Sequence, residues 1–110
     1  VQFAKTFPKI IREIRAVNPD VKIYADNIYN PAKGIDAFSQ VYSVADAYIN
    51  RMNRGFYPSD EYVLVDIKKC FDGEKESMVN LSFKGREIDP HPSEKGHKKI
   101  AQMVIKAMER

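Results

Sequence analysis

The chain has 110 residues, of which 44% are hydrophobic and 11% aromatic, as is typical of a single globular domain. Its net charge is only +3, and its 18 basic residues are interleaved with 15 acidic ones, a pattern that argues against nucleic-acid binding. No apolar run approaches the roughly 20 residues that a bilayer span needs. Cys70 is the only cysteine, which excludes an intrachain disulfide and a cysteine-rich zinc site.

The first predicted element is an amphipathic helix. Its apolar positions recur at helical spacing, with charged residues on the opposite face; they are Phe3, Phe7, Ile10, Ile11, Ile14 and Val17. Because proline is tolerated only in the first turn of a helix, Pro8 is expected to limit this one. We therefore predict a regular helix over residues 8–17, ended by Asn18, Pro19 and Asp20.

Two strands flank a second helix in the next part of the chain. Residues 21–28 form a short run rich in β-formers, and residues 61–67 have a nearly continuous apolar centre, which predicts burial on both faces. The helix is predicted over residues 36–53, with Gly55 near its C-terminal cap. Its expected apolar face consists of Phe38, Val41, Tyr42, Ala45, Tyr48, Ile49 and Met52.

Residues 68–88 have weak periodicity and are predicted to be a loop with one short element. A last helix is expected to begin near Ser93 and to run almost to Arg110, with Ser93 as its N-cap. Its predicted buried residues are Ile100, Ala101, Val104, Ile105 and Met108.

The order helix, strand, helix, strand, loop, helix predicts an α/β layered fold in which a right-handed crossover joins parallel strands. Two strands cannot form a complete parallel sheet, since each leaves edges to pair and faces to cover. We therefore expect the chain to be the second half of a doubly wound domain, incomplete on its own.

A candidate site lies in the run DPHPSEKGH, which begins at Asp89 and ends at His97. Asp89 could orient the imidazole of His91, which would then act as a general base toward a hydroxyl or water. The alternative is that Asp89 caps a local turn and that His91 is a surface residue between two prolines. The spacing alone leaves both interpretations open.

A metal site formed by Asp89, His91 and His97 is a further alternative, but the spacing does not favour it. The chain has no third histidine, and His97, in the first turns of a helix, is more simply a packing or hydrogen-bonding residue. We predict neither a metal nor a cofactor.

A nucleophile cannot be placed. None of the serines follows a strand in a Gly-flanked elbow; they are Ser39, Ser43, Ser59, Ser77, Ser82 and Ser93. Cys70 follows the second strand, but a lone thiol without activating neighbours is interpreted as structural.

Two segments resemble a known family. DPHPSEKGHKKIA, from Asp89 to Ala101, resembles the final conserved block of the SGNH or GDSL-type esterases and acylhydrolases. NPDVKIYADNIYNP, from Asn18 to Pro31, is similar to the strand before the last crossover in bacterial members, and EYVLVDI completes the resemblance in order over the chain.

The resemblance implies a flavodoxin-like fold and a lipase or acylhydrolase that acts on acyl esters through a serine, with His91 as the general base and Asp89 as its carboxylate partner. Many members place the aspartate three residues before the histidine, whereas here it stands two before. The family's Gly-Asp-Ser block and its glycine and asparagine oxyanion blocks do not occur in these 110 residues. Residues 1–110 thus resemble the C-terminal half of one SGNH-hydrolase-like domain.

The half-domain interpretation has two consequences. Because the members of a triad act as a unit, the isolated chain is expected to be inactive as an esterase. Its exposed strand edges are expected to form a homodimer or to pair with the missing N-terminal half. An alternative function is that of a non-enzymatic interaction module, which self-associates through these edges. The compartment is not predicted.

Overall fold

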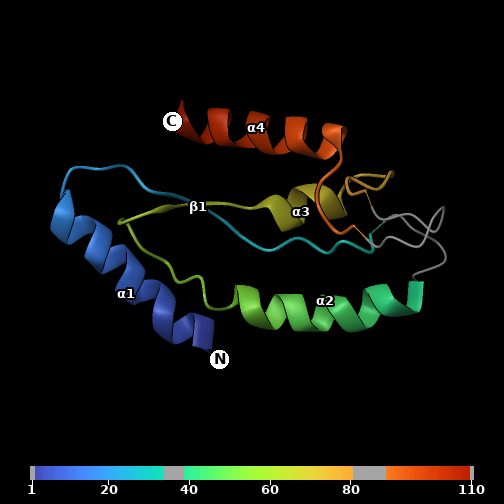
Figure 1. Cartoon of the computed structure of the whole chain (residues 1–110), viewed down its shortest axis with the longest axis horizontal. Helices are drawn as coiled ribbons and strands as arrows, with labels where there is room; N and C mark the ends of the chain where they lie inside the picture. The colour runs from blue at the N-terminus through green and yellow to red at the C-terminus, as the bar shows by residue number, and fades with distance from the viewer. Residues whose placement is uncertain (1, 34–38, 81–88, 110) are drawn as a thin grey trace.

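The computed structural model describes residues 2–33, 39–80 and 89–109. Its elements are α1 (Gln2–Val17), β1 (Tyr24–Asp26), α2 (Ser39–Asn53), β2 (Val63–Val65), α3 (Ile67–Asp72) and α4 (Glu94–Met108). The strands run through the middle of the molecule, with α4 on one side and α1 and α2 on the other (Figure 1). The described residues thus form a mixed arrangement of helices around a small parallel sheet, as the α/β prediction requires.

The two strands are parallel, and Tyr24 lies opposite Val63. The backbone amide of Val63 donates to the carbonyl of Ile23 over 2.8 Å, and the amide of Asn27 donates to the carbonyl of Val65 over 3.2 Å. Since successive residues of a strand direct their backbone groups to opposite sides, Leu64 directs its N–H and C=O away from β1. Among the described residues β2 has no strand on that side, so this edge is free.

The predicted strands are correct in place but too long, since β1 and β2 have three residues each. The prediction that β2 is buried on both faces is wrong. Val65 is 2% exposed, whereas Val63 and Leu64 are each 41% exposed. The narrow sheet explains the difference, because burial on both faces requires neighbouring strands and helices that the described part of the chain does not supply.

Two hydrophobic clusters hold these elements together. The first joins β2 and α3 to α4 and has Val65, Ile67, Phe71 and Met78 at its centre. The second joins α1 to the segment before β2 and has Phe7, Ile11 and Tyr62 at its centre. Aromatic residues thus dominate the packing of α1, whereas α4 contributes aliphatic side chains to its cluster.

Helix α1 begins at Gln2, so the prediction that it begins at Pro8 is wrong. The turn before Pro8 carries Phe3 and Phe7, whose ring centroids each lie 5.0 Å from that of Phe56. Burial of these rings offsets the backbone hydrogen bond that proline removes inside a helix. Gly55 is required by the same contact, since a Cβ there would lie 2.4 Å from the Phe3 ring.

Helix α4 begins as predicted, because the Ser93 hydroxyl accepts a 3.1 Å hydrogen bond from the Gly96 amide as an N-cap. The prediction of its buried face is wrong in part, since Ala101 is exposed and Ile105 and Met108 are 55% and 57% exposed. The sheet beneath α4 is too narrow to cover the full apolar face of the helix.

Helix α2 is also only partly covered. Within it only Ile49 is buried, whereas Val41, Val44 and Tyr48 are exposed, so its predicted apolar face is wrong in part. Residues 36–38 of the predicted helix lie outside the described residues. Helix α3 is the one short element predicted within 68–88, and residues 81–88 lie outside the described part. No helix in the described ranges is long and apolar enough to cross a membrane.

Candidate active site

Residues 89–93 form a loop that is tied by its backbone to residues 78–80. Val79 and Pro92 form an antiparallel bridge. The Asn80 amide donates to the His91 carbonyl and the Ser93 amide donates to the Met78 carbonyl, both over 2.9 Å. Because Ser93 also caps α4, the loop is fixed at the start of this helix.

Within this loop Asp89 and His91 are in direct contact. Oδ1 of Asp89 lies 2.6 Å from Nδ1 of His91 and also accepts a 3.0 Å hydrogen bond from the His91 backbone amide. One carboxylate oxygen thus both caps the turn and faces the ring, a geometry that fits either of the interpretations left open by the sequence.

The hydrogen bonds to Asp89 favour the ionised form of its carboxyl group. The pKa of the Asp89 carboxyl is lowered, first by the backbone hydrogen bond from His91 and then by the bond to its ring. An ionised carboxylate can only accept hydrogen bonds, so Nδ1 of a neutral ring carries the proton and Nε2 is left as a base. The side chain of His91 is 81% exposed, which leaves Nε2 open to an approaching group.

The hydroxyl of Tyr29 donates a 2.7 Å hydrogen bond to the carbonyl of Pro90. Its ring packs on Phe71, with 5.0 Å between centroids. This contact joins the two segments that carry the family resemblance. Spacing in the sequence does not indicate it, because the two residues are 61 positions apart.

Asn80 is a second residue that the sequence does not single out. Its Nδ2 lies 3.3 Å from Oδ2 of Asp89 and 3.3 Å from the carbonyl oxygen of Pro92. The sequence around Asn80 has weak periodicity and does not indicate these contacts.

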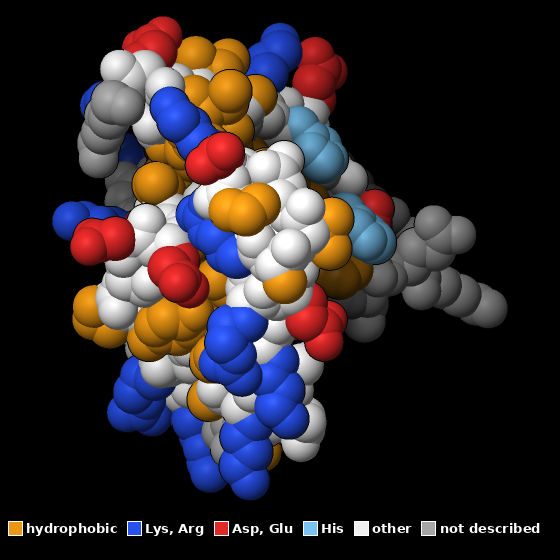
Figure 2. Space-filling view, turned by 90° about the vertical axis from the view of Figure 1, so that its left-hand side faces the viewer, with side chains coloured by type: hydrophobic (Ala, Val, Ile, Leu, Met, Phe, Trp, Pro, Cys, Tyr) orange, Lys and Arg blue, Asp and Glu red, His pale blue; other side chains and the backbone are white. Residues whose placement is uncertain are grey.

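His97 is the other histidine among the sequence candidates. His97 is exposed on the first turn of α4, where its backbone amide donates to the Ser93 carbonyl over 2.8 Å. Both histidine side chains are visible on one face (Figure 2). In residues 2–33, 39–80 and 89–109, no group of three His, Cys, Asp or Glu side chains could hold a metal ion.

No described serine or cysteine is hydrogen bonded to the His91 ring. The described serines are dispersed over α2, the connections and the α4 cap, at Ser39, Ser43, Ser59, Ser77 and Ser93, and Ser82 lies outside the described residues. Burial raises the pKa of the Cys70 thiol, which disfavours the nucleophilic thiolate.

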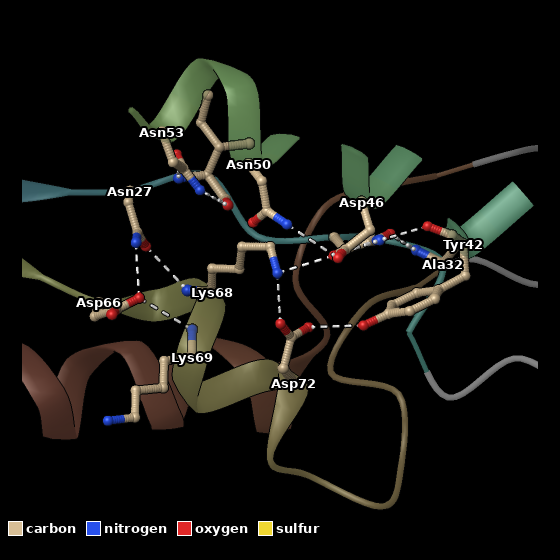
Figure 3. A network of polar contacts seen from close by, with 12 residues as sticks. Asn27, Ala32, Tyr42, Asp46, Asn50, Asn53, Asp66, Lys68, Lys69 and Asp72 are labelled. Atoms are coloured by element: carbon tan, nitrogen blue, oxygen red, sulfur yellow. Dashed lines mark hydrogen bonds and ion pairs between the residues drawn. The ribbon is translucent and has the colours of Figure 1, made fainter. Parts of the chain in front are cut away.

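A separate polar network surrounds Lys68 (Figure 3). Its Nζ lies 2.9 Å from Oδ1 of Asp46 and 2.6 Å from Oδ2 of Asp72. Burial lowers the pKa of Lys68, but the hydrogen bonds to the two carboxylates raise it more, so the net shift is upward. The network joins α2 to α3 through a charged lysine that is 8% exposed.

At the carboxyl ends of the strands, Asn27 connects β1 to the start of α3. It donates to Oδ1 of Asp66 over 2.7 Å and accepts from the Lys68 backbone amide over 2.9 Å. An open hollow of about 320 Å³ lies here; its lining residues are Asn27, Asn50, Asn53, Asp66, Lys68, Lys69 and Asp72. Many of their polar groups are hydrogen bonded to one another (Figure 3). We therefore interpret the hollow as part of the polar network around Lys68.

Comparison with known proteins yields no match, either to a family model, to a curated protein or to a solved structure.

Proposed function

We propose that this chain is the C-terminal part of an SGNH or GDSL-type serine ester hydrolase, a lipase or acylhydrolase of flavodoxin-like fold. His91 would be the general base and Asp89 its carboxylate partner. The observation that carries the proposal is the 2.6 Å contact between Oδ1 of Asp89 and Nδ1 of His91. This contact is the relationship that an acid-base pair needs in order to direct Nε2 toward a hydroxyl.

In the proposed reaction, Nε2 of His91 accepts the proton of a serine hydroxyl as the serine oxygen bonds to the acyl carbon of an ester. The proton then passes to the departing alcohol as its bond to the acyl carbon breaks. A water molecule, deprotonated by the same nitrogen, releases the acid and restores the serine. Asp89 stabilises the imidazolium that forms in each half of this cycle.

The serine and the oxyanion donors would come from a segment outside these 110 residues, since no Gly-Asp-Ser block occurs in them. The Tyr29 to Pro90 hydrogen bond brings together the NIYNP and DPHPS segments, which are the two segments on which the resemblance to the family rests.

The free edge of β2 supports a proposal about partners. Leu64 directs its backbone groups away from β1, and Val44, Tyr48, Ile105 and Met108 are exposed. We propose that a further strand of the same enzyme pairs with this edge, and that a second copy of the chain does so when that strand is absent. The alternative function, a non-enzymatic interaction module, rests on the same edge.

The enzymatic proposal is tested on the protein that the gene encodes, including any residues upstream of Val1. We expect a Gly-Asp-Ser block there and hydrolysis of a short acyl ester that falls by several orders of magnitude in His91→Ala. His97→Gln is the matched control, since it changes the other histidine of the same face and should retain activity within about twofold.

Two outcomes would contradict the enzymatic proposal. One is an encoded protein that lacks His91-dependent hydrolysis. The other is His91-dependent hydrolysis by residues 1–110 alone, which would show that the nucleophile lies within them. The partner proposal is tested by light scattering of the 110-residue chain, for which a clean monomer would contradict pairing between copies.

A further inference from the structure

The carboxylate of Asp89 has two oxygens, and each has a different partner. Oδ1 receives both hydrogen bonds from His91, whereas Oδ2 faces the side-chain amide of Asn80 at 3.3 Å. The Asp89 side chain is 45% exposed. A half-exposed carboxylate on a short side chain can rotate and bond to water instead, so a partner on Oδ2 matters to its orientation.

Asn80 is itself well placed to act as that partner. Its backbone amide donates to the His91 carbonyl over 2.9 Å, directly beside the bridge between Val79 and Pro92. An amide group has two N–H donors. The nitrogen of Asn80 lies 3.3 Å from both Oδ2 of Asp89 and the Pro92 carbonyl oxygen, which lie on either side of His91 in the chain.

We propose that Asn80 is a positioning residue, which holds the Asp89 carboxylate so that Oδ1 faces Nδ1 of His91 and thereby selects the ring nitrogen that carries the proton. The proposal rests on the proposed function, because it deepens the role given there to Asp89 and His91. Asn80 does not contact the reacting atoms, and its effect passes through the carboxylate. Asn80 would therefore determine which tautomer the His91 ring adopts and would not itself be a catalytic group.

A positioning role differs from an incidental contact in its effect on the pKa of Asp89 and on the tautomer of the His91 ring. The hydrogen bond from Asn80 contributes to the lowered pKa of Asp89, after the larger contributions of the His91 backbone and ring. Tyr29 is another described titratable side chain near this carboxylate, and its pKa is raised by burial and by Asp89.

The test is nitrogen-15 NMR of the His91 ring in the protein that the gene encodes, at a pH where this ring is neutral. In the unaltered chain we expect the Nδ1–H tautomer to dominate. In Asn80→Ala we expect a mixture with the Nε2–H tautomer, together with a rise in the pKa of Asp89 measured from its carboxyl carbon. In Asn80→Asp the pKa of Asp89 should rise further, because a second carboxylate then faces the first.

Ser77→Ala is the matched control. The Ser77 hydroxyl accepts a 3.3 Å hydrogen bond from the Val79 amide in the same segment, so its loss loosens the segment without touching Asp89. It should leave both the tautomer and the pKa of Asp89 unchanged. Asn80→Asp preserves side-chain size, so its effect on the His91 tautomer carries the test if Asn80→Ala does not fold.

An unchanged tautomer and an unchanged pKa of Asp89 in a folded Asn80 variant would overturn the positioning role. Equal shifts in Ser77→Ala would overturn it too, because they would reflect general loosening. Neither result bears on ester hydrolysis by the encoded protein, so the failure of this inference is distinguishable from the failure of the proposed function.

Discussion

The hydroxyl of Tyr29 donates a 2.7 Å hydrogen bond to the carbonyl of Pro90, between the two residues of the Asp89 and His91 pair. The Tyr29 ring rests on Phe71, which is 2% exposed. The exposed loop that carries His91 is therefore tied to the hydrophobic core of the chain. This contact makes the geometry of the loop depend on a residue far away in the sequence.

Tyr29→Phe removes only the hydroxyl and should cost about 1 kcal/mol in the free energy of unfolding, the usual contribution of one hydrogen bond. Amide chemical shifts should change mainly at Asp89 and His91, which flank Pro90. Tyr48→Phe is the control, since Tyr48 is 67% exposed and its change should stay within about 0.5 kcal/mol. Urea denaturation gives the energies, and equal effects in both variants would contradict the anchoring role of Tyr29.

Local signals predicted much of the fold. Ser93 precedes an amphipathic run and indeed caps α4, and the order of the elements and the parallel pairing follow from periodicity and turn residues. Burial was less predictable. Val63 and Leu64 are apolar but exposed, because the burial of a strand is set by its neighbours and not by its own residues.

The candidate site likewise contains one contact that local sequence could indicate and others that it could not. The contact of Asp89 with His91 spans two positions, so local spacing could indicate it. The contacts of Tyr29 with Pro90 and of Lys68 with Asp46 join residues that are distant in the chain. A single sequence contains no signal for such pairs, since they arise only when the elements pack.

Lys68→Ala should destabilise the chain strongly. It removes the charge that lies between Asp46 and Asp72 and leaves two partly buried carboxylates facing one another (Figure 3). Losing one member of a buried ion pair is costly, and because the carboxylates are 26% and 27% exposed we expect about 2 to 4 kcal/mol. Urea denaturation measures the change in the free energy of unfolding.

Lys95→Ala is the matched control for this prediction. Its ion pair with Glu76 has side chains that are 58% and 73% exposed, so its loss should leave the free energy of unfolding close to that of the unaltered chain. Lys68→Met retains most of the aliphatic stem and separates lost packing from lost charge. Similar losses in Lys68→Ala and Lys95→Ala would contradict the structural role of the network.

The same network predicts how stability depends on pH. The hydrogen bond from Lys68 lowers the pKa of Asp46 from 3.8 despite the opposing effect of burial. The contribution of Asp46 to stability is therefore complete above its pKa in the unfolded chain. It is lost as the pH falls through its pKa in the folded chain. The pKa of Lys68 is raised from 10.5, so its contribution is complete below that value and is lost as the pH rises through the folded pKa.

Asp46→Asn tests how the free energy of unfolding depends on pH at acid pH, where Asp46 becomes protonated. A protonated aspartic acid resembles asparagine, so the difference in unfolding free energy between the unaltered chain and Asp46→Asn should be largest near neutral pH. It should shrink as the pH falls below about 4. Urea denaturation at several pH values tests this expectation, and a difference that is constant from neutral to acid pH would contradict it.

Gly96→Ala should reverse the usual effect of replacing a helical glycine. Such a change ordinarily stabilises a helix by about 1 kcal/mol. Here a Cβ would lie 2.1 Å from the carbonyl oxygen of Met78, which accepts the 2.9 Å hydrogen bond from the Ser93 amide. The two backbone segments would have to separate, and the overpacking should cost about 1 to 3 kcal/mol.

Gly73→Ala is the control for this substitution. Gly73 has a φ of −79° and a ψ of −11°, in the right-handed helical region, and a Cβ there would meet its nearest atoms at 3.5 Å. Its replacement should be neutral or stabilise by up to about 1 kcal/mol. Because the Met78 to Ser93 bond anchors the His91 loop, the amide shifts of Asp89, His91 and Ser93 should change in Gly96→Ala and not in Gly73→Ala. A Gly96→Ala variant as stable as the unaltered chain would show that the loop does not depend on this close approach.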